Sequence, residues 1–79
     1  MESKPGQEPP GVSLGDIVYT RDGHRLGEIM LIHEGELVVE NGLVFRRYYV
    51  LDCEEVDRSE RGTLITSLTF EEAKAREQR

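Results

Sequence analysis

The sequence predicts an all-β fold, a small antiparallel β-barrel of about five or six strands with a short C-terminal helix. The chain has 79 residues, no tryptophan and few other aromatic residues, so Val, Ile and Leu must supply most of the core. Such β-branched-rich composition favours strands. Glycine-containing turn pairs separate short apolar runs. One of these runs, residues 29–32, is apolar on both faces of a strand, as expected in a closed or strongly curled sheet.

The chain has room for one domain, preceded by a tail. Residues 1–11 hold all three prolines, and Met1 is their one apolar residue. Such a segment cannot bury enough surface to offset its ordering entropy, so a disordered tail is predicted. Residues 12–79 then form the single domain.

The first hairpin is predicted at Asp22-Gly23, because Asp-Gly between apolar runs is a strong hairpin signal. The first strand ends at Thr20, and residues 26–32 return as the second. Residues 33–36 form the next turn, residues 37–40 a third strand, and Asn41-Gly42 another hairpin pair. Residues 43–49 are predicted as a fourth strand or an extended excursion, and residues 49–56 as a fifth, bounded by the polar run 57–62. Residues 63–68 form the last strand.

A helix is predicted over residues 70–79. Thr69 has the side chain of an N-cap, and Glu72 stands three residues later, which is the pattern of a capping box. Phe70 and Ala73 are expected to dock the helix on the sheet. The predicted core of the domain consists of these apolar residues: Ile17, Tyr19, Leu26, Ile29, Leu31, Leu37, Val39, Val50, Val56, Leu64, Leu68 and Phe70.

The charge and the cysteine content indicate which classes of partner and which cellular compartment are compatible with the sequence. The formal net charge is −6, which opposes general binding to nucleic acid or to an anionic membrane. Cys53 is the single cysteine, so an internal disulfide and a thiolate metal cage are excluded. No apolar run approaches the ~20 residues of a membrane span, and residues 1–11 do not resemble a signal peptide. A cytoplasmic protein is predicted.

The order of several segments resembles a PRC-barrel-like domain. The segments are residues 15–19, 22–23, 26–29, 37–39, 54–57 and 64–72, and together they span nearly the whole predicted domain. The resemblance implies a small antiparallel β-barrel that serves assembly and interaction, as in the photosynthetic reaction-centre H subunit and a ribosome maturation factor. It implies no catalytic residues. The short turn at residues 33–36 and the stretch at residues 46–49 depart from the family pattern.

A second resemblance is weaker. Residues 15–18, followed by Gly23 and Gly27, are similar to the KOW motif of SH3-like ribosomal and transcription-factor barrels, which implies RNA or protein binding. The acidic composition and the Asp-Gly turn count against it.

The candidate binding residues lie in one stretch: Phe45, Arg46, Arg47, Tyr48 and Tyr49. An arginine beside a tyrosine can grip a phosphate or stack on an aromatic group. The simpler interpretation, which we favour, is that one tyrosine packs in the core while the arginines meet carboxylates, as cross-strand pairs commonly do.

Other candidate residues do not form a constellation. His24 and His33 lack metal-ligand spacing. Cys53 stands among acidic residues that oppose a thiolate, and Glu54 and Glu55 would point to opposite faces of a strand. No catalytic, metal or cofactor residue is therefore predicted.

The leading hypothesis is a non-enzymatic protein-interaction or assembly module, with a protein partner or self-association. Val44, Phe45 and Leu51 are the apolar residues expected to be spare for a partner. The alternative is an RNA- or ribosome-associated small barrel that uses Arg46, Arg47 and Tyr48, with Arg21 and Arg25.

Overall fold

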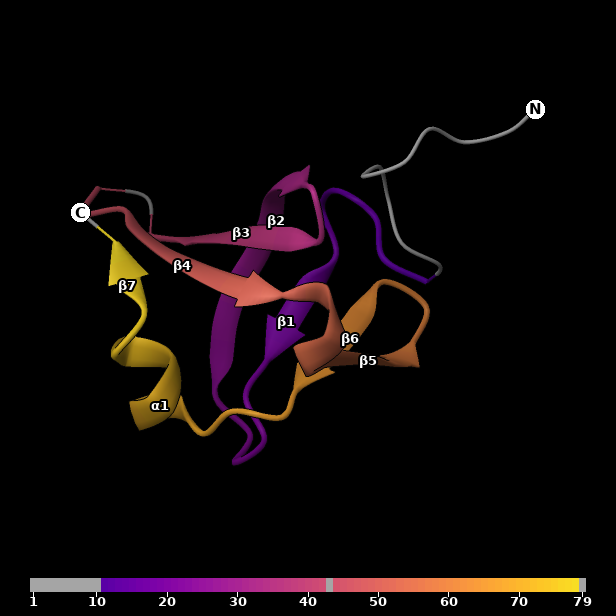
Figure 1. The fold of residues 1–79 in the computed structure, drawn as a ribbon. Coiled ribbons are helices and arrows are strands. Elements are labelled where there is room, and N and C mark those ends of the chain that lie inside the picture. The colour runs from indigo at the N-terminus through magenta and orange to yellow at the C-terminus, as the bar shows by residue number, and fades with distance from the viewer. Residues whose placement is uncertain (1–10, 43, 79) are drawn as a thin grey trace.

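The computed structural model describes residues 11–42 and 44–78, which form one curled β-sheet and a short α-helix (Figure 1). This confirms the all-β class with one short helix. Residues 1–10 of the predicted tail lie outside the described residues. The elements are β1 (Ile17–Tyr19), β2 (Arg25–His33), β3 (Glu36–Asn41), β4 (Arg47–Asp52), the 3-10 helix η1 (Cys53–Glu55), β5 (Val56–Glu60), β6 (Thr63–Thr66), α1 (Phe70–Lys74) and β7 (Glu77–Gln78).

The sheet is mixed and open rather than an antiparallel barrel. Its strand order is β5-β6-β1-β2-β3-β4-β7, so β5 and β7 are its edges within the described residues. β1 to β4 form an antiparallel meander, but β6 lies parallel to β1, with Val18 opposite Leu64. The parallel pair arises because the chain leaves β4, forms the β5–β6 hairpin and returns to the free side of β1. The antiparallel prediction is therefore wrong for this pair, and the described strands do not close into the predicted barrel.

The first hairpin forms where the sequence predicts it. Thr20 N donates to the His24 carbonyl oxygen at 2.7 Å, so Arg21, Asp22 and Gly23 make the turn itself. Gly23 has φ +92°, a conformation that a side chain disfavours. The Thr20 hydroxyl lies within the turn, where it donates to Asp22 Oδ1 at 2.6 Å and accepts from His24 N at 2.9 Å.

Of the next two predicted turns, the structure confirms the first but not the second. The turn at Glu34 and Gly35 is confirmed, and both residues have positive φ, as a two-residue type I′ turn requires. Asn41-Gly42 is not the predicted hairpin pair, because Asn41 still pairs with Arg47 in the β3–β4 ladder. The described residues of the connection are instead Gly42 and residues 44–46. The connection closes so tightly that a Cβ on Gly42 would lie 2.5 Å from the Phe45 carbonyl oxygen.

The strands predicted over residues 43–56 differ from those observed, whereas the last predicted strand, residues 63–68, corresponds to β6. One strand, β4, replaces the two predicted over residues 43–49 and 49–56, and Cys53–Glu55 forms a 3-10 turn. The polar run 57–62 is predicted to bound a strand, yet Asp57 to Glu60 belong to β5. An edge strand has little core to cover, so charged side chains are tolerated there and the apolar signal of a strand is lost.

The helix begins as predicted and ends early. Glu72 N donates to Thr69 Oγ1 at 3.2 Å, and Thr69 N donates to Glu72 Oε1 at 2.8 Å, which is a capping box. The helix ends at Lys74, because the next residues turn back and Glu77–Gln78 pair with β4 as β7. No helix in the described parts of the chain has the length and apolar character needed to cross a bilayer.

The core lies on one face of the sheet, and Ala73 of α1 belongs to it. Its buried apolar side chains are Val12, Val18, Leu26, Ile29, Leu37, Val39, Tyr49, Leu51, Val56, Leu64 and Ala73. This confirms six of the predicted core residues, and two more, Leu68 and Phe70, pack partly buried against it.

Four predicted core residues lie on the opposite side of the sheet, called the outer face here: Ile17, Tyr19, Leu31 and Val50. In β1 the buried side chain is Val18, between Ile17 and Tyr19. In β2 a bulge between Ile29 and Leu31 shifts the alternation, so Leu31 is 51% exposed. In β4 the buried pair is Tyr49 and Leu51, so Leu51 is not spare surface. Periodicity shows which residues share a face but does not show which face is covered.

Candidate protein-binding surface

Tyr48 and Tyr49 point to opposite faces of β4. Tyr49 lies opposite Val39 in the core and is 1% exposed. It is therefore not accessible to a partner, although the sequence analysis includes it among the candidate binding residues. Burial disfavours the charged phenolate and raises the pKa of Tyr49, and the nearby Glu77 carboxylate adds to this effect. Tyr48 lies opposite Glu40 on the outer face and is half-buried.

The two neighbouring arginines face carboxylates. Arg46 Nη1 lies 3.3 Å from Glu40 Oε2, and Arg47 Nη1 lies 3.8 Å from Glu77 Oε1. The stretch therefore has the arrangement favoured from the sequence, with one tyrosine in the core and both cations beside anions. This pairing reduces the positive charge that the stretch presents to a phosphate.

The tip of the β3–β4 loop is the most exposed apolar part of the predicted site. Val44 is 81% exposed and Phe45 is 83% exposed. A fully solvated phenylalanine contributes little to folding, whereas aromatic side chains are common binding anchors. Phe45 is therefore accessible to a partner, and its role as a contact residue stays a prediction.

A row of apolar residues crosses three strands on the outer face. Val38 lies opposite Leu31 on β2 and opposite Val50 on β4, so the three side chains are neighbours. We call these three residues the outer row. The row is not predicted as a surface from the sequence, because Leu31 and Val50 belong to the predicted core.

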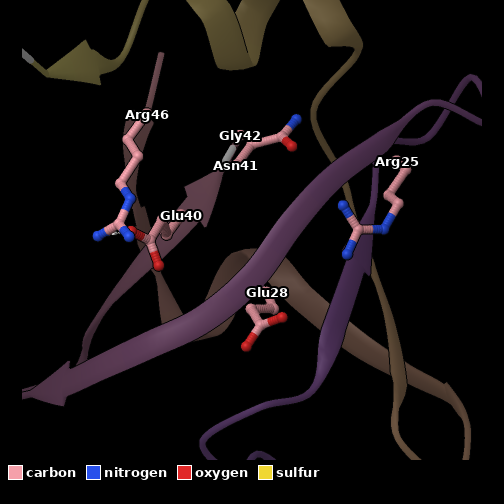
Figure 2. Close-up of a pocket in the computed structure, with 6 residues that line it drawn as sticks. All are labelled: Arg25, Glu28, Glu40, Asn41, Gly42 and Arg46. Atoms are coloured by element: carbon pink, nitrogen blue, oxygen red, sulfur yellow. Dashed lines mark ion pairs between the residues drawn. The ribbon is translucent and has the colours of Figure 1, made fainter. Parts of the chain in front are cut away.

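A cavity of about 450 Å³ adjoins this row (Figure 2). Glu28 on β2 and Glu40 on β3 are direct cross-strand partners. Arg46 reaches Glu40 from one side, and Arg25 stands at the other rim. The lining residues are Arg25, Glu28, Glu40, Asn41, Gly42 and Arg46.

The cavity combines predicted and unpredicted residues. Two cations of the RNA hypothesis, Arg25 and Arg46, line it, whereas Arg21 does not. The pairing of Glu28 with Glu40 is not predicted from the sequence, because it depends on the register between β2 and β3. That register follows from the Glu34-Gly35 turn together with the bulge after Ile29, and only the turn has a recognisable sequence signal.

The histidines and Cys53 do not converge on a site. The His24 ring lies 4.8 Å from the Phe70 ring, and His33 Nε2 lies 3.7 Å from its neighbour Glu34. Glu55, which the sequence analysis placed on a strand with Glu54, instead belongs to η1 and pairs with Arg76. In residues 11–42 and 44–78, no three His, Cys, Asp or Glu side chains are grouped to hold a metal ion.

Comparison of the chain with protein-family models, curated proteins and solved structures gave no match. The resemblances to PRC-barrel-like and KOW domains therefore remain predictions.

Proposed function

We propose that this chain is a non-enzymatic protein-interaction or assembly module that binds through its outer face. The observation that carries the proposal is the outer row, Leu31, Val38 and Val50, an apolar strip on the side of the sheet away from the core. A small protein gains stability by burying such residues, so an apolar strip on the uncovered face favours a binding role.

The β3–β4 loop supports the same interpretation. Along β3 the order is the outer row at Val38, then Glu40 in the cavity, then the loop that carries Val44 and Phe45. Successive residues on one strand face are roughly 7 Å apart. One partner segment therefore has room to contact the outer row and the cavity together.

The test compares two exposed leucines. Leu31→Ser removes the most exposed member of the outer row, and Leu14→Ser changes a similarly exposed leucine outside the sheet. Light scattering over a concentration series gives the mass of wild type and both variants. We expect that Leu31→Ser weakens the association about 30-fold, which corresponds to the loss of one hot-spot side chain, and that Leu14→Ser leaves it unchanged.

If wild type stays monomeric at all concentrations, the same three proteins serve as baits for a heterologous partner. Capture of a defined partner by wild type and Leu14→Ser but not by Leu31→Ser supports the proposal. Equal behaviour of all three proteins in both experiments contradicts it.

A further inference from the structure

We propose that the partner of the outer face is a second copy of this chain, packed face to face about a two-fold axis that runs parallel to the outer row. This inference rests on the proposed function and specifies which protein occupies the surface. Two-fold dimers are the commonest soluble oligomers, and their interface must be self-complementary, because the same patch supplies both sides. The outer face meets this condition in its apolar residues and in its charges.

The outer row packs on itself in such a dimer. Val38 is at its centre, with Leu31 and Val50 as cross-strand neighbours on either side. Leu31 is 51% exposed and the two valines are half-buried, so each copy has apolar surface left to cover. Sheets that pack face to face lie about 10 Å apart, and their inner side chains interdigitate. Burial of the row therefore supplies the hydrophobic part of the association.

One end of the row is acidic. Glu36 on β3 and Asp52 on β4 are direct cross-strand partners, and both are exposed. Neither carboxylate has an ion-pair partner among the residues that the structure describes. Glu36 lies two residues from Val38, so this end stands roughly 7 Å from the row on the same face.

The other end of the row carries hydrogen-bond donors. Glu40 lies two residues from Val38 in the opposite direction, and Figure 2 shows Arg46 beside it, with Nη1 3.3 Å from Glu40 Oε2. The Arg46 side chain is 59% exposed, so N–H groups of its five-donor guanidinium remain accessible to a further carboxylate. Tyr48 lies opposite Glu40 and adds a hydroxyl. This end therefore offers donors where the first end offers acceptors.

The two-fold axis brings these unlike ends together. Rotation about it keeps the row in place and reverses every strand, so Glu36 and Asp52 of each copy lie over the Arg46 end of the other. Glu36 and Glu40 are equally far from Val38 along β3, so both ends are at the same distance from the axis. Arg46 then lies between Glu40 of its own copy and Glu36 of the other. An axis parallel to the strands instead stacks acidic end on acidic end, which is disfavoured.

The net charge of the chain does not prevent this dimer. A charge of −6 on each copy repels the other copy at long range. At physiological ionic strength the Debye length is about 8 Å, so exposed charges farther apart than this are largely screened. The contacts inside the interface then decide the outcome, and these contacts pair opposite charges.

Two charge reversals test the pairing of the ends. Glu36→Lys sets a cation over Arg46 of the other copy, and Arg46→Glu sets an anion over Glu36. Each variant alone is expected to associate at least about tenfold more weakly than wild type, because the repulsion occurs twice in each dimer. An equimolar mixture is expected to recover association to within about threefold of wild type, because each chain then complements the other. Sedimentation velocity gives the dissociation constants, and circular dichroism checks that each variant is folded.

A control variant separates the interface from net charge. Arg61→Glu makes the same charge change as Arg46→Glu in the turn between β5 and β6, and is expected to associate as wild type does. If it weakens association as much as Arg46→Glu, net charge explains the result and the inference is wrong.

The remaining outcomes distinguish this inference from the proposed function. A mixture that associates no better than its separate variants overturns the two-fold arrangement. If wild type is monomeric and captures a heterologous partner that Leu31→Ser loses, the proposed function stands and this inference fails. If wild type dimerises and neither Leu31→Ser nor the charge reversals weaken the dimer, the outer face is not the interface and both fail.

Discussion

Asp22 Oδ1 accepts a hydrogen bond from Phe70 N at 3.0 Å, which joins the β1–β2 turn to the first residue of α1 across 48 positions of the chain. Two further contacts strengthen the junction: Arg21 N donates to the Leu68 carbonyl oxygen at 2.8 Å, and the His24 ring packs on Phe70. A five-residue helix is too short to be stable alone. The turn therefore stabilises α1 from outside the helix.

Asp22→Asn should weaken the fold at neutral pH and flatten its acid dependence. The Thr20 hydroxyl, and then the Phe70 N–H, hold the pKa of Asp22 below its usual value. A lowered pKa in the folded state stabilises the protein above the unfolded pKa, and this contribution is lost as pH falls through the folded pKa. Urea midpoints between pH 7 and pH 2 should show a smaller acid-induced loss in the variant. An unchanged pH profile would contradict this role.

Gly27→Ala should destabilise the protein by about 2–4 kcal/mol. Gly27 has φ +149°, and a Cβ there would overlap the Glu40 carbonyl oxygen and lie 2.9 Å from Val39 Cγ1. The variant therefore adds steric overlap to backbone strain. Gly15→Ala is the control, because Gly15 has φ +90° with open space around it. Its expected cost is about 1–2 kcal/mol from strain alone. Chemical denaturation measures both.

Tyr49→Ala should cost about 3–5 kcal/mol, since it removes a fully buried ring and leaves a cavity. Tyr48→Ala should cost about 1 kcal/mol, because Tyr48 is half-buried on the outer face. Thermal or urea unfolding of the pair tests the assignment of faces in β4. Similar costs for the two would contradict it.

Arg76→Ala should raise the pKa of Glu55. Arg76 Nη1 lies 2.5 Å from Glu55 Oε1, and this hydrogen bond is the main cause that lowers the pKa of Glu55, with Asp52 N as a second donor. Carboxyl shifts in an NMR pH titration measure the change. The loss of stability should stay below about 1 kcal/mol, because the pair is partly exposed. Arg61→Ala serves as control and should leave Glu55 unchanged.

RNA should not bind through Arg46, Arg47 and Tyr48. Both arginines face carboxylates, and the chain has a net charge of −6. A chemical-shift titration with a short single-stranded RNA at low and physiological salt tests this. Salt-dependent shifts at those three residues would support the RNA-associated alternative instead.

The sequence predicts turns and helix starts best, because a single residue type at one position is enough to favour them. Gly23, Gly35 and the capping box at Thr69 and Glu72 mark two turns and a helix start correctly. It predicts poorly where partners far apart in the chain decide the structure. The charged strand β5 exists because it pairs with β6, and β7 exists because β4 offers it an edge.

In the candidate site too, features set by local residues are predicted and features set by distant strand partners are not. Phe45 is exposed, as expected of a spare apolar residue, although it precedes β4 instead of lying in a strand over residues 43–49. The outer row and the Glu28–Glu40 pair were missed, because a bulge near Met30 resets the face on which side chains of β2 lie. A bulge of this kind depends on pairing across strands, and local propensity carries little information on it.

The parallel pairing of β1 with β6 also constrains how the molecule reaches this state. Ile17 is the register partner of Thr63, so the first strand keeps an unpaired backbone edge until the sixth has been synthesised. The early hairpins are local, but closing this pair requires a loop that spans most of the domain. Such non-local closure is slow, in the range of about milliseconds to seconds. During translation, the emergence of the last strands rather than the first hairpin sets the moment at which the nascent chain acquires its native sheet.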